Sequence, residues 1–186
     1  MRAGRLQGLD FGLKNFRISA EQQLARNKQI DREHLRQIHT ALFAYKEAHG
    51  HFPEYLSQLA PKFLDPAALE SPRRSTDGMN AIIATDHPDP ALAQPAYGFE
   101  FSNLVFRDGR TFEDIKEVQR AEWGDAVPIL RAFGYEKVIN MAYCGDLYET
   151  DLNWEWDPAT LEGVTDDILD AIFAALPSAE EWTPLP

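Results

Sequence analysis

The sequence predicts an α+β fold in which one long helix packs on a small antiparallel sheet. Residues 19–49 contain no Gly or Pro, and their apolar positions recur at helical spacing. Three β-type runs come much later, between residues 126 and 154, and glycine-containing turns divide them. A helix followed by consecutive strands is typical of α+β proteins and not of alternating parallel βαβ units.

The length and composition predict a single domain. The chain has 186 residues, of which 44% are apolar, and its aromatic residues include 11 Phe, 6 Tyr and 4 Trp. This is enough to fill one core and too short for two comfortable ones. We expect an N-terminal extension at residues 1–18 and one α+β domain at residues 19–186.

The long helix should begin after Ser19, which can cap its start, and end at Gly50. Its second half has an apolar stripe with steps of three and four residues: Leu35, Ile38, Leu42, Tyr45 and His49. We expect the first four of these to face the sheet, and three basic side chains to stay exposed: Arg32, Arg36 and Lys46.

The first half of this helix should project from the body of the protein. Between Glu21 and Glu33 it offers few apolar side chains among charges and amides. The residues that could contact a partner there are Leu24, Arg26, Lys28 and Ile30.

The remaining elements follow from turn and capping signals. Pro53 starts a short helix at residues 54–59, and residues 71–95, rich in proline, Asp and Ser, form a surface loop around a short strand at Ala81–Ala84. Strands and hairpins should fill residues 96–154, with one helix among them at Phe112–Trp123, capped by Thr111 and stopped by Gly124. A further amphipathic helix is predicted at residues 165–176.

The charge distribution argues against nucleic-acid binding. The formal net charge is −12, yet residues 1–50 carry nine basic and five acidic side chains, so the remaining residues sum to −16. No Lys or Arg occurs from Val138 to the end of the chain. Such a surface repels phosphate backbones.

The sequence offers no motif for catalysis. It contains no G-x-S-x-G, G-x-G-x-x-G or Walker-type loop. Of the histidines, His34 and His39 are five residues apart, which does not place them on one helix face, while His49 and His51 flank Gly50. We interpret the histidines as solvated or capping residues and expect no enzymatic activity.

The single cysteine and an acidic window are the remaining candidates for chemistry in the sequence. Cys144 ends the apolar run that starts at Val138, so we expect a small buried side chain and not a nucleophile. Asp146, Glu149 and Asp151 could bind calcium, but strand alternation places Glu149 and Asp151 on one face, which favours a solvated strand face. No other cofactor is expected.

Two stretches of the chain resemble a known family. Residues 33–53 combine Leu-Arg-Gln-Ile, a helical Ala-Leu stretch, Gly50 and the step Phe52-Pro53, and residues 56–66 follow with a short helix and its exit. This pattern resembles the start of the globular domain in type II secretion pseudopilins and related type IV pilin-like proteins. Residues 124–149 resemble, more loosely, the hairpin that closes such domains, although Ala132–Tyr135 lacks the His or Cys that relatives often have there.

The resemblance implies a structural subunit of a type II secretion or pilus-like assembly with no chemistry of its own. Its partners would be other pilin-like or secretion-system proteins, including further copies of the chain, on the periplasmic or extracellular side of the cell envelope. The family's leader and apolar anchor do not occur within Met1–Arg32, so contact with a membrane would depend on an anchor missing from this sequence. The alternatives are a soluble module that binds a ligand or partner on a pilin-like fold, and an enzyme using the acidic face.

Overall fold

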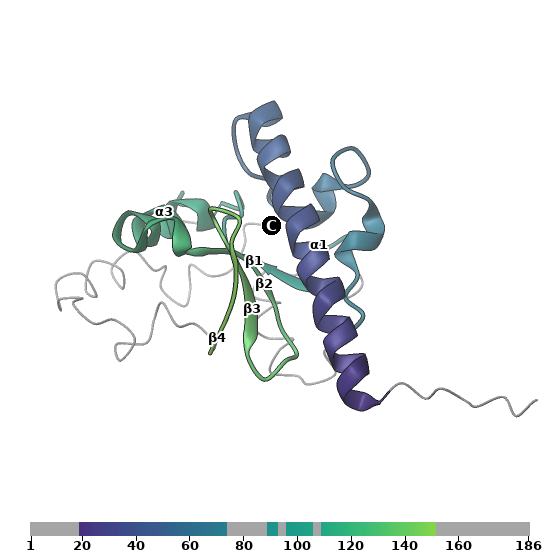
Figure 1. Cartoon of the computed structure of the whole chain (residues 1–186). Coiled ribbons are helices and arrows are strands. Elements are labelled where there is room, and N and C mark those ends of the chain that lie inside the picture. Colours follow the sequence, from purple (N-terminus) through teal and green to yellow (C-terminus); the bar gives the residue numbers. More distant parts are fainter. Residues whose placement is uncertain (1–18, 74–88, 93–95, 106–108, 152–186) are drawn as a thin grey trace, which may run out of the picture.

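The computed structural model describes residues 19–73, 89–92, 96–105 and 109–151 (Figure 1). The predicted extension at 1–18, the strand at Ala81–Ala84 and the helix at 165–176 lie outside these residues. The described elements, in chain order, are α1 (Ala20–His49), two four-residue 3₁₀ turns at Leu56–Leu59 and Pro66–Leu69, β1 (Tyr97–Phe99), α3 (Phe112–Trp123), a three-residue 3₁₀ turn at Gly124–Ala126, β2 (Pro128–Ala132), β3 (Val138–Ala142) and β4 (Leu147–Thr150).

The four strands form one antiparallel sheet in the order β1-β2-β3-β4, and α1 lies across one of its faces (Figure 1). The predicted α+β architecture, with a long N-terminal helix and a small antiparallel sheet, is confirmed. Both hairpins, β2–β3 and β3–β4, are present, and their registers pair Arg131 with Asn140 and Ile139 with Glu149. The pairing follows from the short connections, which leave antiparallel neighbours as the simplest arrangement.

The ends of both helices are set by local sequence. Ser19 and Gln22 form a capping box at the start of α1, and Gly50 ends the helix with φ of 84°, a conformation that favours glycine. Thr111 and Asp114 form a second capping box at the start of α3. The predicted bounds of both helices are therefore confirmed.

The core lies between α1 and the sheet. Leu35, Ile38 and Leu42 are fully buried, as the helical stripe predicts. Tyr45 is only half-buried and His49 is exposed, and both rings lie against Phe63 in the segment that follows α1. The side chains that meet the helix from the other elements include Phe52, Leu59, Phe101, Ile129, Leu130, Ile139 and Met141.

Two of the three basic residues predicted to be exposed are half-buried. Arg36 is exposed, but Arg32 bonds to Glu149 and Lys46 lies over the ring of Phe52. The aliphatic stems of these side chains cover apolar surface while their charged ends find partners at its rim. The prediction considered only the apolar stripe and could not place the acidic partners.

The opposite face of the sheet holds a buried ion network. Arg131 is 1% exposed, and its guanidinium donates to Glu100 at 3.1 Å and to Asn140 at 3.2 Å. Lys116 of α3 reaches the same Glu100 at 3.1 Å. Burial raises the pKa of Glu100, but the two cations outweigh it and lower this pKa to about 2. The carboxylate therefore ties α3 to the sheet.

Candidate functional site

The most unusual group in the described structure is a buried carboxylate on α1. Asp31 is 0% exposed, and three hydroxyl groups from distant segments converge on it. Tyr97 donates to Oδ1 at 2.8 Å, Ser71 donates to Oδ2 at 3.1 Å, and Tyr135 also donates to Oδ2. We refer to Asp31, Ser71, Tyr97 and Tyr135 as the Asp31 cluster.

A histidine extends this cluster along α1. His34 Nδ1 lies 2.9 Å from the hydroxyl oxygen of Tyr97. Since the only hydroxyl proton of Tyr97 goes to Asp31, the nitrogen of His34 must be the donor in this contact. The hydrogen bonds thus run in one direction, from His34 through Tyr97 to Asp31.

Both tyrosines remain protonated at neutral pH. Burial, and then the neighbouring Asp31, raise the pKa of Tyr97 far above its ordinary value. Burial and the hydrogen bond to Asp31 raise the pKa of Tyr135 in the same direction. Lys28 and Arg73 approach the ring of Tyr135, with 5.5 and 5.1 Å to its centre. The hydroxyls are therefore fixed hydrogen-bond donors and poor bases or nucleophiles.

This arrangement suits a structural role. Asp31 is removed from solvent, and its oxygens already accept three hydrogen bonds. The cluster instead joins α1 to β1, to the β2–β3 turn and to the segment around Ser71. Satisfied networks of this kind fix how buried elements are oriented.

The sequence did not identify Asp31 as a buried residue, because it lies in the half of the helix that is predicted to project from the body of the protein. A signal was present, since residues 31, 35, 38 and 42 continue the stripe with steps of four, three and four. The helix engages the rest of the protein from Lys28 onward, because Lys28 Nζ lies 2.9 Å from Glu149. The prediction that the helix projects as far as Glu33 is therefore wrong.

The four residues predicted to contact a partner divide into two pairs. Leu24 is 40% exposed and Arg26 is also exposed, so both are open to solvent. Lys28 and Ile30 are half-buried, and Lys28 is committed to Glu149. The first two turns are thus the part of α1 in which every residue is exposed.

The three calcium candidates do not form one site. Asp146 is exposed in the β3–β4 turn, and Asp151 is exposed just after β4. Glu149 lies between them in sequence but faces α1, where Lys28 and Arg32 bond to it. The hydrogen bond from Lys28, foremost, lowers the pKa of Glu149. The expectation of a solvated strand face therefore holds for the exposed Asp151, whereas Glu149 is half-buried and paired with two cations of α1.

Cys144 is exposed, which contradicts the expectation of a buried side chain. Strand β3 ends at Ala142, and Cys144 lies in the following turn, where its Sγ is 3.6 Å from Asp146 Oδ2. The apolar run in the sequence simply continues past the end of the strand. Across the described residues, no group of three or more His, Cys, Asp and Glu side chains could hold a metal ion.

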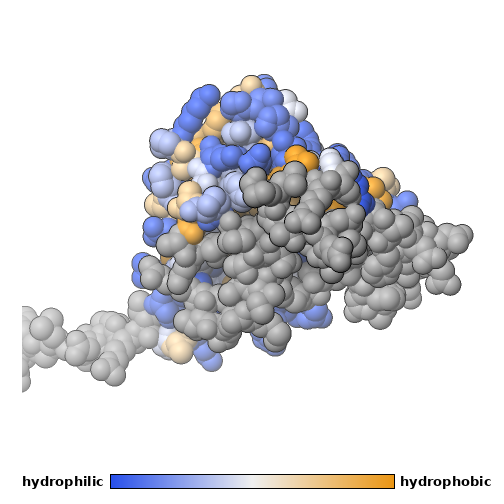
Figure 2. Space-filling view, turned by 180° about the vertical axis from the view of Figure 1, so that it is seen from behind, coloured by the Kyte–Doolittle hydropathy of each residue, from blue (hydrophilic) through white to orange (hydrophobic). Residues whose placement is uncertain are grey.

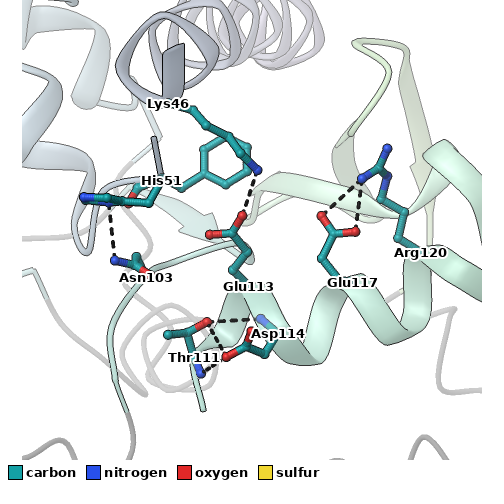
Figure 3. Close-up of polar contacts among 9 residues, drawn as sticks. Lys46, His51, Asn103, Thr111, Glu113, Asp114, Glu117 and Arg120 are labelled. Atoms are coloured by element: carbon teal, nitrogen blue, oxygen red, sulfur yellow. Dashed lines mark hydrogen bonds and ion pairs between the residues drawn. The ribbon is translucent and has the colours of Figure 1, made fainter. Parts of the chain in front are cut away.

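Apart from the Asp31 cluster, a polar contact joins α1 to α3 (Figure 3). Lys46 Nζ lies 2.7 Å from Glu113 Oε1 and 4.1 Å from the ring centre of Phe52. One helical turn further along α3, Arg120 pairs with Glu117, and its guanidinium lies 3.8 Å from the ring centre of Tyr143. The ion pair attaches α3 to α1, and the cation–π contact attaches it to the residue that follows β3.

The described surface carries little apolar area. The large hydrophobic side chains exposed there are Leu24, Val105 and Val118, which belong to three separate segments. Seen from behind, the coloured part of the surface is mostly hydrophilic, with a few hydrophobic residues between (Figure 2). None of the described helices has the length and apolarity that a membrane crossing requires.

The sequence matches no known protein-family model, and no curated protein or solved structure shows significant similarity to it.

Proposed function

We propose that this chain is a non-enzymatic structural subunit of a type II secretion or pilus-like assembly, built on a pilin-like globular domain. Its partners would be other pilin-like or secretion-system proteins in the cell envelope. The proposal rests on the resemblance of residues 33–66 to the pseudopilin domain start and on the way α1 is divided between a free and a packed part.

The division of α1 is the observation that carries the proposal. Every side chain from Ala20 to Arg26 is exposed, whereas the helix is anchored from Lys28 onward. A capped helix with seven exposed residues at its start has few tertiary contacts to stabilise it there, and isolated short helical segments are marginal in water. Contact with a neighbouring subunit would supply the packing that the described residues of this chain do not provide there.

The chemistry of the described residues supports a role without catalysis. The buried carboxylate of Asp31 is occupied by hydroxyl donors, and the raised pKa of Tyr97 and of Tyr135 keeps these donors protonated. His39 is also engaged, because its Nε2 donates to the carbonyl oxygen of Tyr143 at 3.0 Å. Groups held in this way position elements of the fold.

Site-specific photo-cross-linking tests the proposal. A benzoylphenylalanine at Leu24 of the full chain, expressed in its native host, should cross-link to a pilin-like subunit or to a second copy, identified by mass spectrometry. Val118 on α3 has a similar exposure, 38% against 40%, and serves as the matched control. The proposal fails if Leu24 gives no cross-link, if both positions give the same adducts, or if the adduct is unrelated to secretion or pilus assembly.

A further inference from the structure

The C-terminal end of α1 gathers aromatic and imidazole rings at the surface. His49 is the last residue of the helix, and its ring stacks on Tyr45 with 4.2 Å between centres. Phe63 lies against the same pair, 5.9 Å from His49. After Gly50 the chain turns back, so that the ring of His51 comes within 6.5 Å of the ring of His49. Both histidines are exposed.

The hydrogen bonds of His51 prepare it as a metal ligand. Its Nδ1 lies 2.7 Å from the carbonyl oxygen of Phe52, which can only accept, so Nδ1 carries the proton. In the neutral ring the lone pair is then on Nε2. A backbone carbonyl holding one ring nitrogen is the usual way in which proteins orient a histidine ligand. The amide nitrogen of Asn103 also lies 3.3 Å from Nδ1, but a protonated Nδ1 cannot accept from it, so the shorter bond to Phe52 decides which ring nitrogen carries the proton.

The local charges tolerate a cation. The carbonyl groups at the end of α1 carry the negative end of the helix dipole, which favours positive charge within the last turn. Two lysines lie nearby, but Lys46 is paired with Glu113, and Lys62 is drawn over the ring of Phe63 at 4.8 Å. Imidazole nitrogens suit Cu²⁺, Ni²⁺ and Zn²⁺, whereas calcium prefers oxygen ligands.

We propose that His49 and His51 form an open two-histidine site for a divalent transition metal, with water in the remaining positions. Imidazole nitrogens lie about 2 Å from a bound ion, so two rings on one ion have centres roughly 5 Å apart. A torsional change of the exposed His49 side chain, which would move its ring relative to Tyr45, would bring the observed 6.5 Å to that separation. The bound ion would fasten the end of α1 to the segment that starts at His51. This inference does not depend on the proposed function.

Copper titration of the full chain without a polyhistidine tag tests the site. The Cys144→Ser background removes the exposed thiol, and Cu²⁺ is the probe because it binds nitrogen ligands most tightly among these ions. Calorimetry should give one ion per chain, and electron paramagnetic resonance should show two coupled imidazole nitrogens. His49→Gln and His51→Gln should each weaken binding at least tenfold.

His39→Gln is the control, since Nε2 of His39 is bound to a backbone carbonyl, and its affinity should stay within twofold of the background protein. Circular dichroism verifies that each variant folds, as expected for changes at the exposed His49 and His51 and at the half-buried His39, where glutamine keeps a donor. Absence of one-to-one binding overturns the proposal. So does a single coupled nitrogen, or binding that survives either substitution, because both would indicate a histidine acting alone.

Discussion

Tyr97 donates its hydroxyl proton to Asp31 over 2.8 Å, although 66 residues separate them in the sequence. This bond connects the first strand to a point on α1 that is closed to solvent. It also explains why a charged residue occupies a position in phase with Leu35 and Ile38. The carboxylate replaces apolar packing by hydrogen bonds, whose loss in a buried site is costly.

Asp31→Asn should lower the free energy of unfolding by about 2–4 kcal/mol, because an amide at this buried position cannot accept from all three hydroxyls. Tyr97→Phe, which removes one donor and keeps the charge, should cost about 1 kcal/mol. Urea unfolding measures both. Glu33→Gln, on the exposed side of the same helix, is the control, and an Asp31→Asn variant as stable as this control would contradict the structural role of the cluster.

Leu42→Ala should destabilise the protein by about 2–5 kcal/mol, because Leu42 is fully buried between α1 and the sheet. Leu24→Ala is the same change in the same helix, so the difference in helix propensity cancels. Leu24 is 40% exposed, and its replacement should alter stability by no more than about 0.5 kcal/mol. Similar thermal melts for the two variants would mean that the packed and exposed halves of α1 are assigned wrongly.

Glu100 should make the protein sensitive to acid. Its folded pKa, about 2, is below the ordinary value of 4.5, so its stabilising contribution is present above pH 4.5 and is lost as the pH falls through 2. Denaturant unfolding at pH 7 and pH 2 should show a smaller loss for Glu100→Gln than for the unmodified protein, by roughly 2–3 kcal/mol. Glu33→Gln, half-exposed on the surface, should leave the loss unchanged; an equal loss in all three proteins would exclude Glu100 as its source.

Lys46 and Glu113 should couple weakly but measurably. A double-mutant cycle with alanine at both positions should give a coupling energy of roughly 0.5–1 kcal/mol, because the two side chains are partly buried, with 30% and 18% of their surfaces exposed. High salt should reduce this coupling, since solvent still reaches both charges. Arg36 and Glu33 form the comparison pair, at 3.7 Å with both side chains more than half exposed, and should give no measurable coupling. If the two cycles agree, the bond between α1 and α3 contributes nothing beyond a surface contact.

The sequence by itself determined the elements whose signals are local. The stripe of Leu35, Ile38 and Leu42 predicted which face of α1 is buried, because helical periodicity depends only on neighbouring residues. Ser19 and Thr111 fixed helix starts for the same reason. The three β-type runs gave three antiparallel strands, since short turns leave little other choice.

Only the tertiary structure decided how the polar residues are used. Glu149 belongs to an acidic stretch, yet it faces two cations of α1 that lie far away in the sequence. Asp31 is buried because hydroxyls from three other segments reach it, and Cys144 is exposed because its strand ends two residues earlier. A polar side chain takes its role from partners that chain folding brings together, and no periodicity in its own neighbourhood records them.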